Sequence, residues 1–227
     1  MPQLDGRSNR PVAVVTGAAG RLGRALGAEL NRRGIPVAAI VRSPSEASDI
    51  TGMQPFVCDM TDEASVVATF LRVREEMGPI GHCVHAIGAW DMKPILETTL
   101  AGWRQLLDVN LTTAFLCIRE AVRHMAHEGT GGIVAIASRQ GADRAPTGQA
   151  AYSASKAGLI RLAEAVADEH GPHGLTIRVV APSTILFDGD SGAGIPVVDL
   201  ARLCVDLTDP RHAAPNGSVT RAYGTAS

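Results

Sequence analysis

Two residues whose side chains could move a proton stand four positions apart in the segment YSASK. Tyr152 carries a phenol and Lys156 an ammonium, and apolar residues recur at steps of three and four from Leu159 to Val166, which predicts an amphipathic helix. On that helix the two side chains share one face, one turn apart. A nearby ammonium favours the phenolate and so lowers the pKa of the phenol toward that of a useful acid or base. A lone YxxxK is more often a half-buried tyrosine beside a solvated lysine, so the interpretation depends on the other motifs.

A glycine-rich turn, TGAAGRLG at residues 16–23, lies between a β-branched run at 11–15 and a helical run at 24–33. Strand, glycine turn and helix together are the context of a dinucleotide-binding motif. Gly17 suits the tight turn, Gly20 lets backbone approach phosphate, and Gly23 lets the helix pack on the strand. The N-terminus of the helix would face the pyrophosphate. We therefore predict a dinucleotide cofactor, with further contacts from the turn residues Ala19, Arg21 and Leu22.

The residues after the next two predicted strands indicate which dinucleotide binds. Strand 37–41 is followed by Arg42 and Ser43 rather than by the acid that usually holds the ribose hydroxyls of NAD. Their donors suit a 2′-phosphate, so we predict NADP (as NADPH) in preference to NAD, with a solvated surface arginine as the alternative. A third strand, 56–58, leads into Asp59 and Met60. The carboxylate there suits a hydrogen bond from the adenine amino group or, equally, the capping of a turn.

The fourth predicted strand, 81–87, leads into a second candidate cofactor segment. Gly88 lets the backbone beside Ala86 come close to the ribose, and Trp90 follows in a loop where it can line a substrate cleft. Two histidines alternate along this strand, but no third ligand is within reach in the sequence. We therefore predict no metal site.

Two polar residues stand where either a ligand or a buried partner is expected. Ser138 follows strand 132–137, and ligands of open parallel sheets bind beyond the carboxyl ends of the strands. Asn110 lies in the middle of a predicted helix over 101–125, flanked by apolar residues. An asparagine facing inward needs hydrogen-bond partners. From the residues alone, a structural and a catalytic role are equally compatible with this position.

The alternation of strands and helices predicts an α/β fold, a single doubly wound parallel sheet with helices on both faces. A length of 227 residues suits one domain over 1–227, with a flexible polar start at 1–10 and a frayed tail at 224–227. The remaining predicted elements are a strand at 175–181, a short loop at 188–196, a helix at 197–207 and a closing strand at 219–223.

Composition narrows the class of protein. The formal charge of -2 gives no electrostatic reason to expect nucleic acid or an anionic membrane as a partner. No apolar run approaches the roughly 18 residues of a membrane span, and the polar start lacks the apolar stretch of a secretion signal. The four cysteines show no ligand spacing, which is typical of reduced thiols in a cytoplasmic protein.

Taken together, these motifs resemble the short-chain dehydrogenase/reductase family over almost the whole chain. The resemblance is carried by TGAAGRLG, Asp59 after the third strand, Asn110 in DVNLTTAF, Ser138, and YSASKAGL. Each motif is loose alone, but their order and spacing are specific. The resemblance implies a Rossmann fold and a small-molecule carbonyl or alcohol substrate. It also implies that the helices carrying Asn110 and Tyr152 pack into a homodimer or homotetramer.

The resemblance further implies a catalytic group of Ser138, Tyr152, Lys156 and Asn110. During reduction, hydride passes from the nicotinamide to a carbonyl carbon while Tyr152 protonates the oxygen. Ser138 would stabilise the charge on that oxygen. Lys156 would lower the pKa of the tyrosine and bind the nicotinamide ribose, and Asn110 would hold a water that relays protons. Tyr152 and Lys156 therefore also count as cofactor contacts, together with Pro182 and Ile185 near the nicotinamide.

The sequence departs from the family pattern in five places. Arg21 replaces the middle glycine of the turn, the usual Asn-Asn-Ala-Gly reads HAIG at 85–88, Ser183 follows Pro182 in place of glycine, and Phe187 stands near an expected threonine. The segment 188–196 is also too short for the helical lid that usually covers the substrate. These departures bear on the substrate and the efficiency rather than on the fold.

The sequence therefore favours an NADP-dependent carbonyl reductase of a small or medium hydrophobic ketone or aldehyde. A 3-oxoacyl-thioester reductase is the alternative within enzymes, because Gln149 before Tyr152 permits it and an open cleft could admit a carrier-bound substrate. In either case Gln149 would line the substrate site with Trp90. A redox-silent dinucleotide-binding regulator is the alternative from another class, and the intact Ser138, Tyr152 and Lys156 argue against it.

Overall fold

The computed structural model describes residues 10–224, so the predicted flexible start and frayed tail fall outside the described residues at 1–9 and 225–227. Within it, seven parallel strands form one sheet in the order β3-β2-β1-β4-β5-β6-β9. The predicted doubly wound parallel sheet is confirmed. The strands are β1 (Val12–Thr16), β2 (Val37–Val41), β3 (Gln54–Val57), β4 (Ile80–His85), β5 (Gly131–Ile136), β6 (Leu175–Pro182) and β9 (Val219–Ala222).

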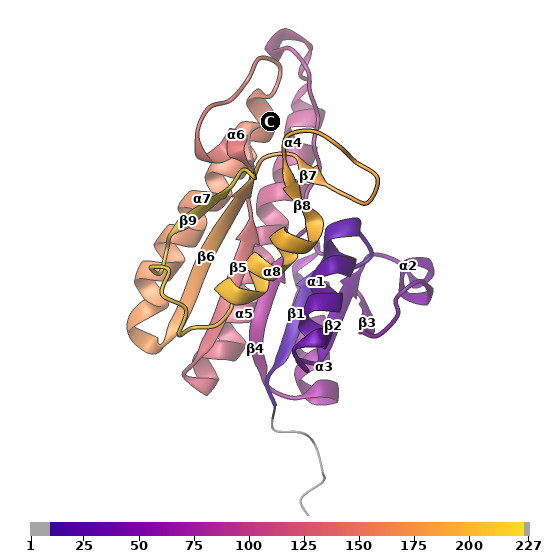
Figure 1. Ribbon diagram of the computed structural model, residues 1–227, viewed down its shortest axis with the longest axis vertical. Coiled ribbons are helices and arrows are strands. Elements are labelled where there is room, and N and C mark those ends of the chain that lie inside the picture. Colours follow the sequence, from indigo (N-terminus) through magenta and orange to yellow (C-terminus); the bar gives the residue numbers. More distant parts are fainter. Residues whose placement is uncertain (1–9, 225–227) are drawn as a thin grey trace, which may run out of the picture.

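Helices cover both faces of this sheet (Figure 1). Alternate residues of β1 supply the two cores, because successive side chains of a strand point to opposite faces. Val12 and Val14 pack against one helical layer, and Ala13 and Val15 pack against the other. The first layer contains α3 (Glu63–Met77), α5 (Thr113–Glu128) and α7 (Ala150–His170), and the second contains α1 (Arg21–Arg32) and α8 (Val197–Leu207).

The order of the strands places the site. The chain moves outward from β1 to β2 and β3, and then returns to place β4 on the other side of β1. Connections therefore leave the carboxyl ends of β1 and β4 in opposite directions, which opens a crevice between them. Register Thr16↔His85 aligns the last residues of these two strands. The glycine turn after β1 and the segment after β4 consequently face each other across the crevice.

Two elements differ from the sequence-based expectation in a way that matters for the site. The predicted single helix over 101–125 is divided into α4 (Leu100–Leu107), a π-helical turn (Asp108–Thr112) and α5. Apolar periodicity runs through all three, so it carries no sign of the extra residue in the turn. The predicted strand 81–87 ends at His85, and residues 86–88 leave the sheet to line the crevice.

The segment after β6 is more ordered than a plain loop. Its two ends form a small parallel pair, β7 (Ile185–Leu186) with β8 (Ile195–Pro196). Phe187 donates its backbone N–H to Asp190 at 2.9 Å, which closes a turn between the two strands. No helical lid lies between them within the described range, in agreement with the short length expected for this segment.

Candidate active site

The glycine turn after β1 adopts the conformation that its glycines allow. Gly17 has a φ of +66°, and a Cβ at this position would also lie 3.3 Å from the backbone of Ala86. A Cβ on Gly23 would lie 2.3 Å from the carbonyl oxygen of Gly17, which no side chain permits. Gly20 is the N-cap of α1, which begins at Arg21, three residues before the predicted start. The N-terminus of α1 is thus held at the mouth of the crevice, where its free N–H groups suit an anion.

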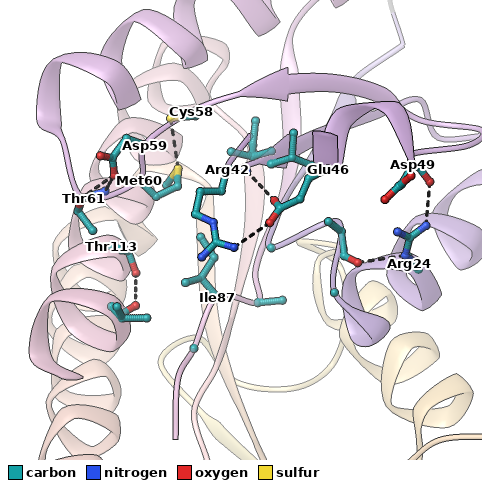
Figure 2. A pocket seen from close by; sticks show the side chains of 18 residues that line it. Arg24, Arg42, Glu46, Asp49, Cys58, Asp59, Met60, Thr61, Ile87 and Thr113 are labelled. Carbon is teal, nitrogen blue, oxygen red and sulfur yellow. Dashed lines mark hydrogen bonds and ion pairs between the residues drawn. The ribbon is translucent and has the colours of Figure 1, made fainter. Parts of the chain in front are cut away.

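A cavity of about 510 Å³ opens beside this turn (Figure 2). It runs across the carboxyl ends of β1, β2 and β4 and is large enough for the adenosine part of a dinucleotide. Eight of its lining residues come from the turn, β2 and the ends of β3 and β4, as the sequence predicts for the cofactor. These are Gly17, Ala19, Gly20, Arg42, Asp59, Met60, Ala86 and Gly88.

Arg42 points across this cavity but does not stand alone (Figure 2). Glu46 accepts from the backbone N–H of Arg42 at 2.8 Å and from its guanidinium at 3.1 Å. The arginine side chain is 85% exposed, so this ion pair is readily opened by solvent or by a competing anion. Ser43 does not line the cavity. Its hydroxyl accepts from the N–H of Glu46 and caps the short helix α2 (Pro44–Ser48).

The carboxylate of Asp59 is fixed at the edge of the same cavity. It accepts from the hydroxyl of Thr61 at 2.6 Å and from the Thr61 N–H at 2.9 Å, and these bonds lower its pKa. The turn-capping role and the lining of the nucleotide cavity therefore occur together at this residue. Asp62 caps α3 by accepting from the N–H of Ser65 at 2.8 Å.

A second cavity, of about 400 Å³, continues from the first and holds the predicted chemistry. The two share Ala86, Ile87 and Gly88, so a single ligand can extend through both. Ser138 follows β5 as predicted, two residues after its end at Ile136, and α7 presents Tyr152 and Lys156 into this space. The predicted residues that line it are Leu22, Ala86, Gly88, Trp90, Ser138, Tyr152, Lys156, Pro182 and Ile185.

The proton-carrying groups of this reaction cavity are strongly desolvated. Lys156 is buried, and loss of solvation lowers the pKa of its ammonium to about 8. Its Nζ donates to the carbonyl oxygen of Ile136 at 2.9 Å. Burial also raises the pKa of Tyr152, and a hydrogen bond with Ser138 partly offsets that rise. Desolvation thus determines the direction of the shift, and the lowering of the tyrosine pKa by Lys156 that the sequence leads us to expect remains a prediction.

Asn110 does not line the reaction cavity but binds the backbone of Ala89, which does. Its Oδ1 accepts from the N–H of Ala89 at 2.8 Å, and its Nδ2 donates to the Ala89 carbonyl at 2.9 Å and to Ser155 at 2.9 Å. Ser155 in turn donates to the carbonyl of Tyr152. Asn110 therefore ties the segment after β4 to the helix that carries the tyrosine. A Cβ on Gly88 would lie 3.0 Å from Lys156 Nζ and 3.3 Å from Asn110 Oδ1, so a side chain there would press on both groups.

His85, one of the departures from the family pattern, is a buried neutral residue. Its Nδ1 lies 3.0 Å from Thr16 Oγ1 and its Nε2 lies 3.4 Å from Thr113 Oγ1. Because the Thr113 hydroxyl donates to Val109, Nε2 must carry the proton and Nδ1 accepts from Thr16. Burial and the charge of Lys156 lower the pKa of His85 to about 3. The imidazole thus joins β1, β4 and α5. It takes no part in the hydrogen bonds that Asn110 makes to Ala89 and Ser155.

Two other departures meet in space. The guanidinium carbon of Arg21 lies 3.7 Å from the ring centroid of Phe187, within the range of a cation–π contact. Arg21 begins α1 and Phe187 follows β7, so the contact joins the glycine turn to the segment after β6. Neither side chain lines the two cavities. The replacement of a glycine by arginine is therefore matched by an aromatic partner.

Gln149 lies outside the reaction cavity. It is buried at the start of α7, and its Oε1 has no hydrogen-bond partner within the described chain. Its predicted role in lining the substrate site therefore remains a prediction. Sequence reasoning also missed Arg24, Glu46 and Asp49 of the nucleotide cavity. Glu46 could have been found from the S-x-x-E spacing after β2, which is typical of a helix cap.

Comparison with known proteins agrees with this geometry. The model of the family described as short chain dehydrogenase matches residues 11–191. The chain belongs to the short-chain dehydrogenase/reductase family. It is therefore an oxidoreductase of a family that binds nicotinamide dinucleotides, and its recognition from the motifs is confirmed.

Several relatives of this enzyme have known activities. It is 32% identical to D-threitol dehydrogenase of Mycolicibacterium smegmatis, over 82% of this chain and 73% of the relative. It is 34% identical to cis-4-hydroxycyclohexanecarboxylate dehydrogenase of Sinomonas cyclohexanicum, over 82% and 76%. It is 31% identical to 3-oxoacyl-[acyl-carrier-protein] reductase of Escherichia coli, over 78% and 74%.

Solved structures show the same architecture. A short-chain dehydrogenase/reductase from Burkholderia xenovorans superposes with a TM-score of 0.84 at 26% identity, over 94% of the enzyme and 95% of that chain.

Across residues 10–224, every helix is too short or too polar to span a bilayer. In the same range no three His, Cys, Asp or Glu side chains are grouped so as to hold a metal ion.

Proposed function

We propose that the enzyme is an NADP(H)-dependent carbonyl reductase that converts a ketone or aldehyde to an alcohol. The observation that supports this most directly is the reaction cavity itself, in which Ser138, Tyr152 and Lys156 line one space that continues into the nucleotide cavity. The glycines at 17 and 88 fit a dinucleotide, because a side chain at either would crowd the cavity wall. When bound there, the nicotinamide supplies the hydride.

The residues of the enzyme then have distinct tasks. Ser138 donates a hydrogen bond to the carbonyl oxygen and stabilises the charge that develops on it. Tyr152 gives its phenolic proton to the same oxygen, and the positive charge of Lys156 stabilises the phenolate that remains. Lys156 also holds the ribose beside it, next to the close backbone at Gly88. Asn110, through its hydrogen bonds to Ala89 and Ser155, fixes the segment after β4 against α7. It is also proposed to hold the water that resupplies the proton to Lys156.

The proposed preference for NADP depends on Arg42. Its guanidinium reaches across the nucleotide cavity, where a 2′-phosphate would compete with the single carboxylate of Glu46. A doubly charged phosphate accepts a two-pronged hydrogen bond from arginine and is the stronger partner. Glu46 would then serve the ribose hydroxyls when NADH binds instead. The enzyme is therefore proposed to favour NADPH and to accept NADH weakly.

A 3-oxoacyl-thioester reductase is the second candidate, and the relative from Escherichia coli favours it. The relative from Sinomonas cyclohexanicum, which by its name acts on a hydroxycyclohexane carboxylate, favours a small alicyclic or aliphatic substrate instead. We further propose a cytoplasmic homodimer or homotetramer that pairs through α5 and α7, as the family resemblance implies. All four cysteines are buried and free, which suits a reducing compartment.

The test is oxidation of NADPH, followed by its absorbance, over a panel of ketones, aldehydes and 3-oxoacyl thioesters. Turnover of simple carbonyl compounds at the higher kcat/KM supports the proposal, and a strong preference for thioesters supports the second candidate. Tight cofactor binding without turnover of any compound in the panel would indicate a redox-silent regulator and overturn both.

A further inference from the structure

The reaction cavity does not end at the catalytic residues. Arg139 and Gln140 line it and also line a neighbouring cavity of about 430 Å³. We call this neighbouring space the outer cavity; its other lining residues are Arg144, Ala145, Pro146 and Thr147. The segment between Ser138 and Tyr152 thus lines both the reaction cavity and the outer cavity. None of the residues of the outer cavity lines the nucleotide cavity, so the outer cavity is available to the substrate.

The outer cavity is lined by two arginines, Arg139 and Arg144, and by no carboxylate. Within residues 10–224 neither arginine forms an ion pair. The acid between them, Asp143, is already engaged. It accepts from the Tyr223 hydroxyl and forms an ion pair with Arg221 at 2.8 Å, and these contacts, with a smaller effect of the charge of Arg139, lower its pKa.

Packing holds one of these arginines at the junction of the two cavities. The guanidinium carbon of Arg139 lies 5.9 Å from the ring centroid of Tyr223, within cation–π range. Arg139 begins the short helix α6 (Arg139–Ala142), whose N-cap is the catalytic Ser138. The cation is therefore one residue from the group that binds the substrate oxygen, and it remains solvent-facing and free to pair with an anion.

An exposed aromatic residue also lines the reaction cavity. Trp90 is 58% exposed, and Met92 and Ile95 follow it as exposed apolar residues. Lys93 of the same segment donates its N–H to the carbonyl of Gly148 at 2.7 Å, next to Thr147 of the outer cavity, and its ammonium pairs with Asp91. The reaction cavity therefore offers a substrate both an apolar surface at Trp90 and a cation at Arg139.

Resting on the proposed function, we propose that the physiological substrate is an amphiphilic carbonyl compound that carries an oxyanion. Its carbonyl lies at Ser138 and Tyr152, its apolar body lies against Trp90, and its carboxylate or similar group pairs with Arg139 and Arg144. Arginine suits this task because its planar fork of donors matches a carboxylate. Because Arg139 lines both cavities and Arg144 lines only the outer one, a series of substrates of increasing length measures how many bonds lie between the carbonyl and the anion.

The experiment compares straight-chain methyl-keto acids of increasing length, from levulinate upward, with their methyl esters. Each pair differs only in the anion, so the ratio of kcat/KM for acid and ester isolates its contribution. We expect the acids to be preferred, with an optimum at one chain length. Arg139→Gln should raise KM for the acid about tenfold, as loss of one charge-assisted hydrogen bond implies, with little change in kcat. The ester should be unaffected, and Arg139→Lys should recover part of the loss.

Arg161→Gln is the matched control, because it removes an exposed arginine of α7 that lines neither cavity. Calorimetric titration of the keto acids gives a readout independent of turnover, and the binding should weaken with added salt. Equal binding and equal kcat/KM for acid and ester, or an Arg139→Gln variant that behaves as the control, would overturn the inference. If neither acid nor ester is reduced by NADPH, the proposed function fails, while calorimetry still decides the anion site.

Discussion

Replacement of Lys156 by methionine is expected to change how the stability of the enzyme depends on pH. The ammonium is buried in the folded protein, where its pKa falls from 10.5 to about 8 because of desolvation. Between these two values the unfolded chain still binds a proton at this lysine while the folded protein does not. The free energy of unfolding of the wild type therefore rises with pH in this window relative to the variant. At about 1.4 kcal/mol per pH unit, the total gain is about 3 kcal/mol.

The assay is urea unfolding of both proteins from about pH 7 to about pH 10.5, with the difference in unfolding free energy plotted against pH. Loss of the hydrogen bond to Ile136 adds an offset that does not vary with pH, so the slope is the observable. Lys93→Met is the control, because it removes the only other lysine of the chain, whose ammonium is solvated. A difference that stays flat across the window would refute the buried, destabilised ammonium. A difference that falls with pH would show that folding favours the charged form.

The contacts of Arg42, Glu46 and Phe187 lead to further predictions about cofactor binding, and the family resemblance leads to one about assembly. Arg42→Ala should weaken NADPH binding about tenfold or more and leave NADH nearly unchanged, whereas Glu46→Gln should tighten NADPH and weaken NADH. Fluorescence titration of each reduced cofactor measures both, and equal effects on the two cofactors would contradict the 2′-phosphate role. Phe187→Ala should speed cofactor release severalfold, because it removes the cation–π contact with Arg21. Stopped-flow displacement measures that rate, and Phe187→Tyr, which keeps an aromatic partner, should restore it. Light scattering at micromolar concentration should give a dimer or a tetramer, and a monomer would contradict pairing through α5 and α7.

The parts of the fold that follow from local chemistry were predictable. β2 and α8 have the bounds that their sequence patterns indicate. In each, the pattern is complete within the element: a β-branched run for the buried strand and an amphipathic repeat for the helix. The glycine turn was predictable for the same reason, since the positive φ of Gly17 and the close approach of Gly23 to the carbonyl oxygen of Gly17 both arise within eight residues of chain.

The parts that depend on residues far apart in the sequence were not predictable from patterns. The contact of Arg21 with Phe187 joins two departures that look unrelated along the chain, and nothing in either local sequence indicates the other. The π-helical turn at Asn110 leaves the apolar periodicity intact, and the side chain in that turn is bonded to Ala89, which lies 21 residues earlier in the chain. The hydrogen bond from the Lys93 N–H to the Gly148 carbonyl likewise joins the segment after β4 to the residues before α7, and neither local sequence indicates it.

The central claim is that the phenol of Tyr152 delivers the proton during carbonyl reduction, and Tyr152→Phe tests it most directly. The variant keeps the ring that lines the cavity and removes only the hydroxyl. Single-turnover absorbance of bound NADPH on mixing with a carbonyl substrate should show reduction slowed by roughly a thousandfold, with the dissociation constant of NADPH nearly unchanged. Reduction by the variant at a rate close to that of the wild type would contradict the account.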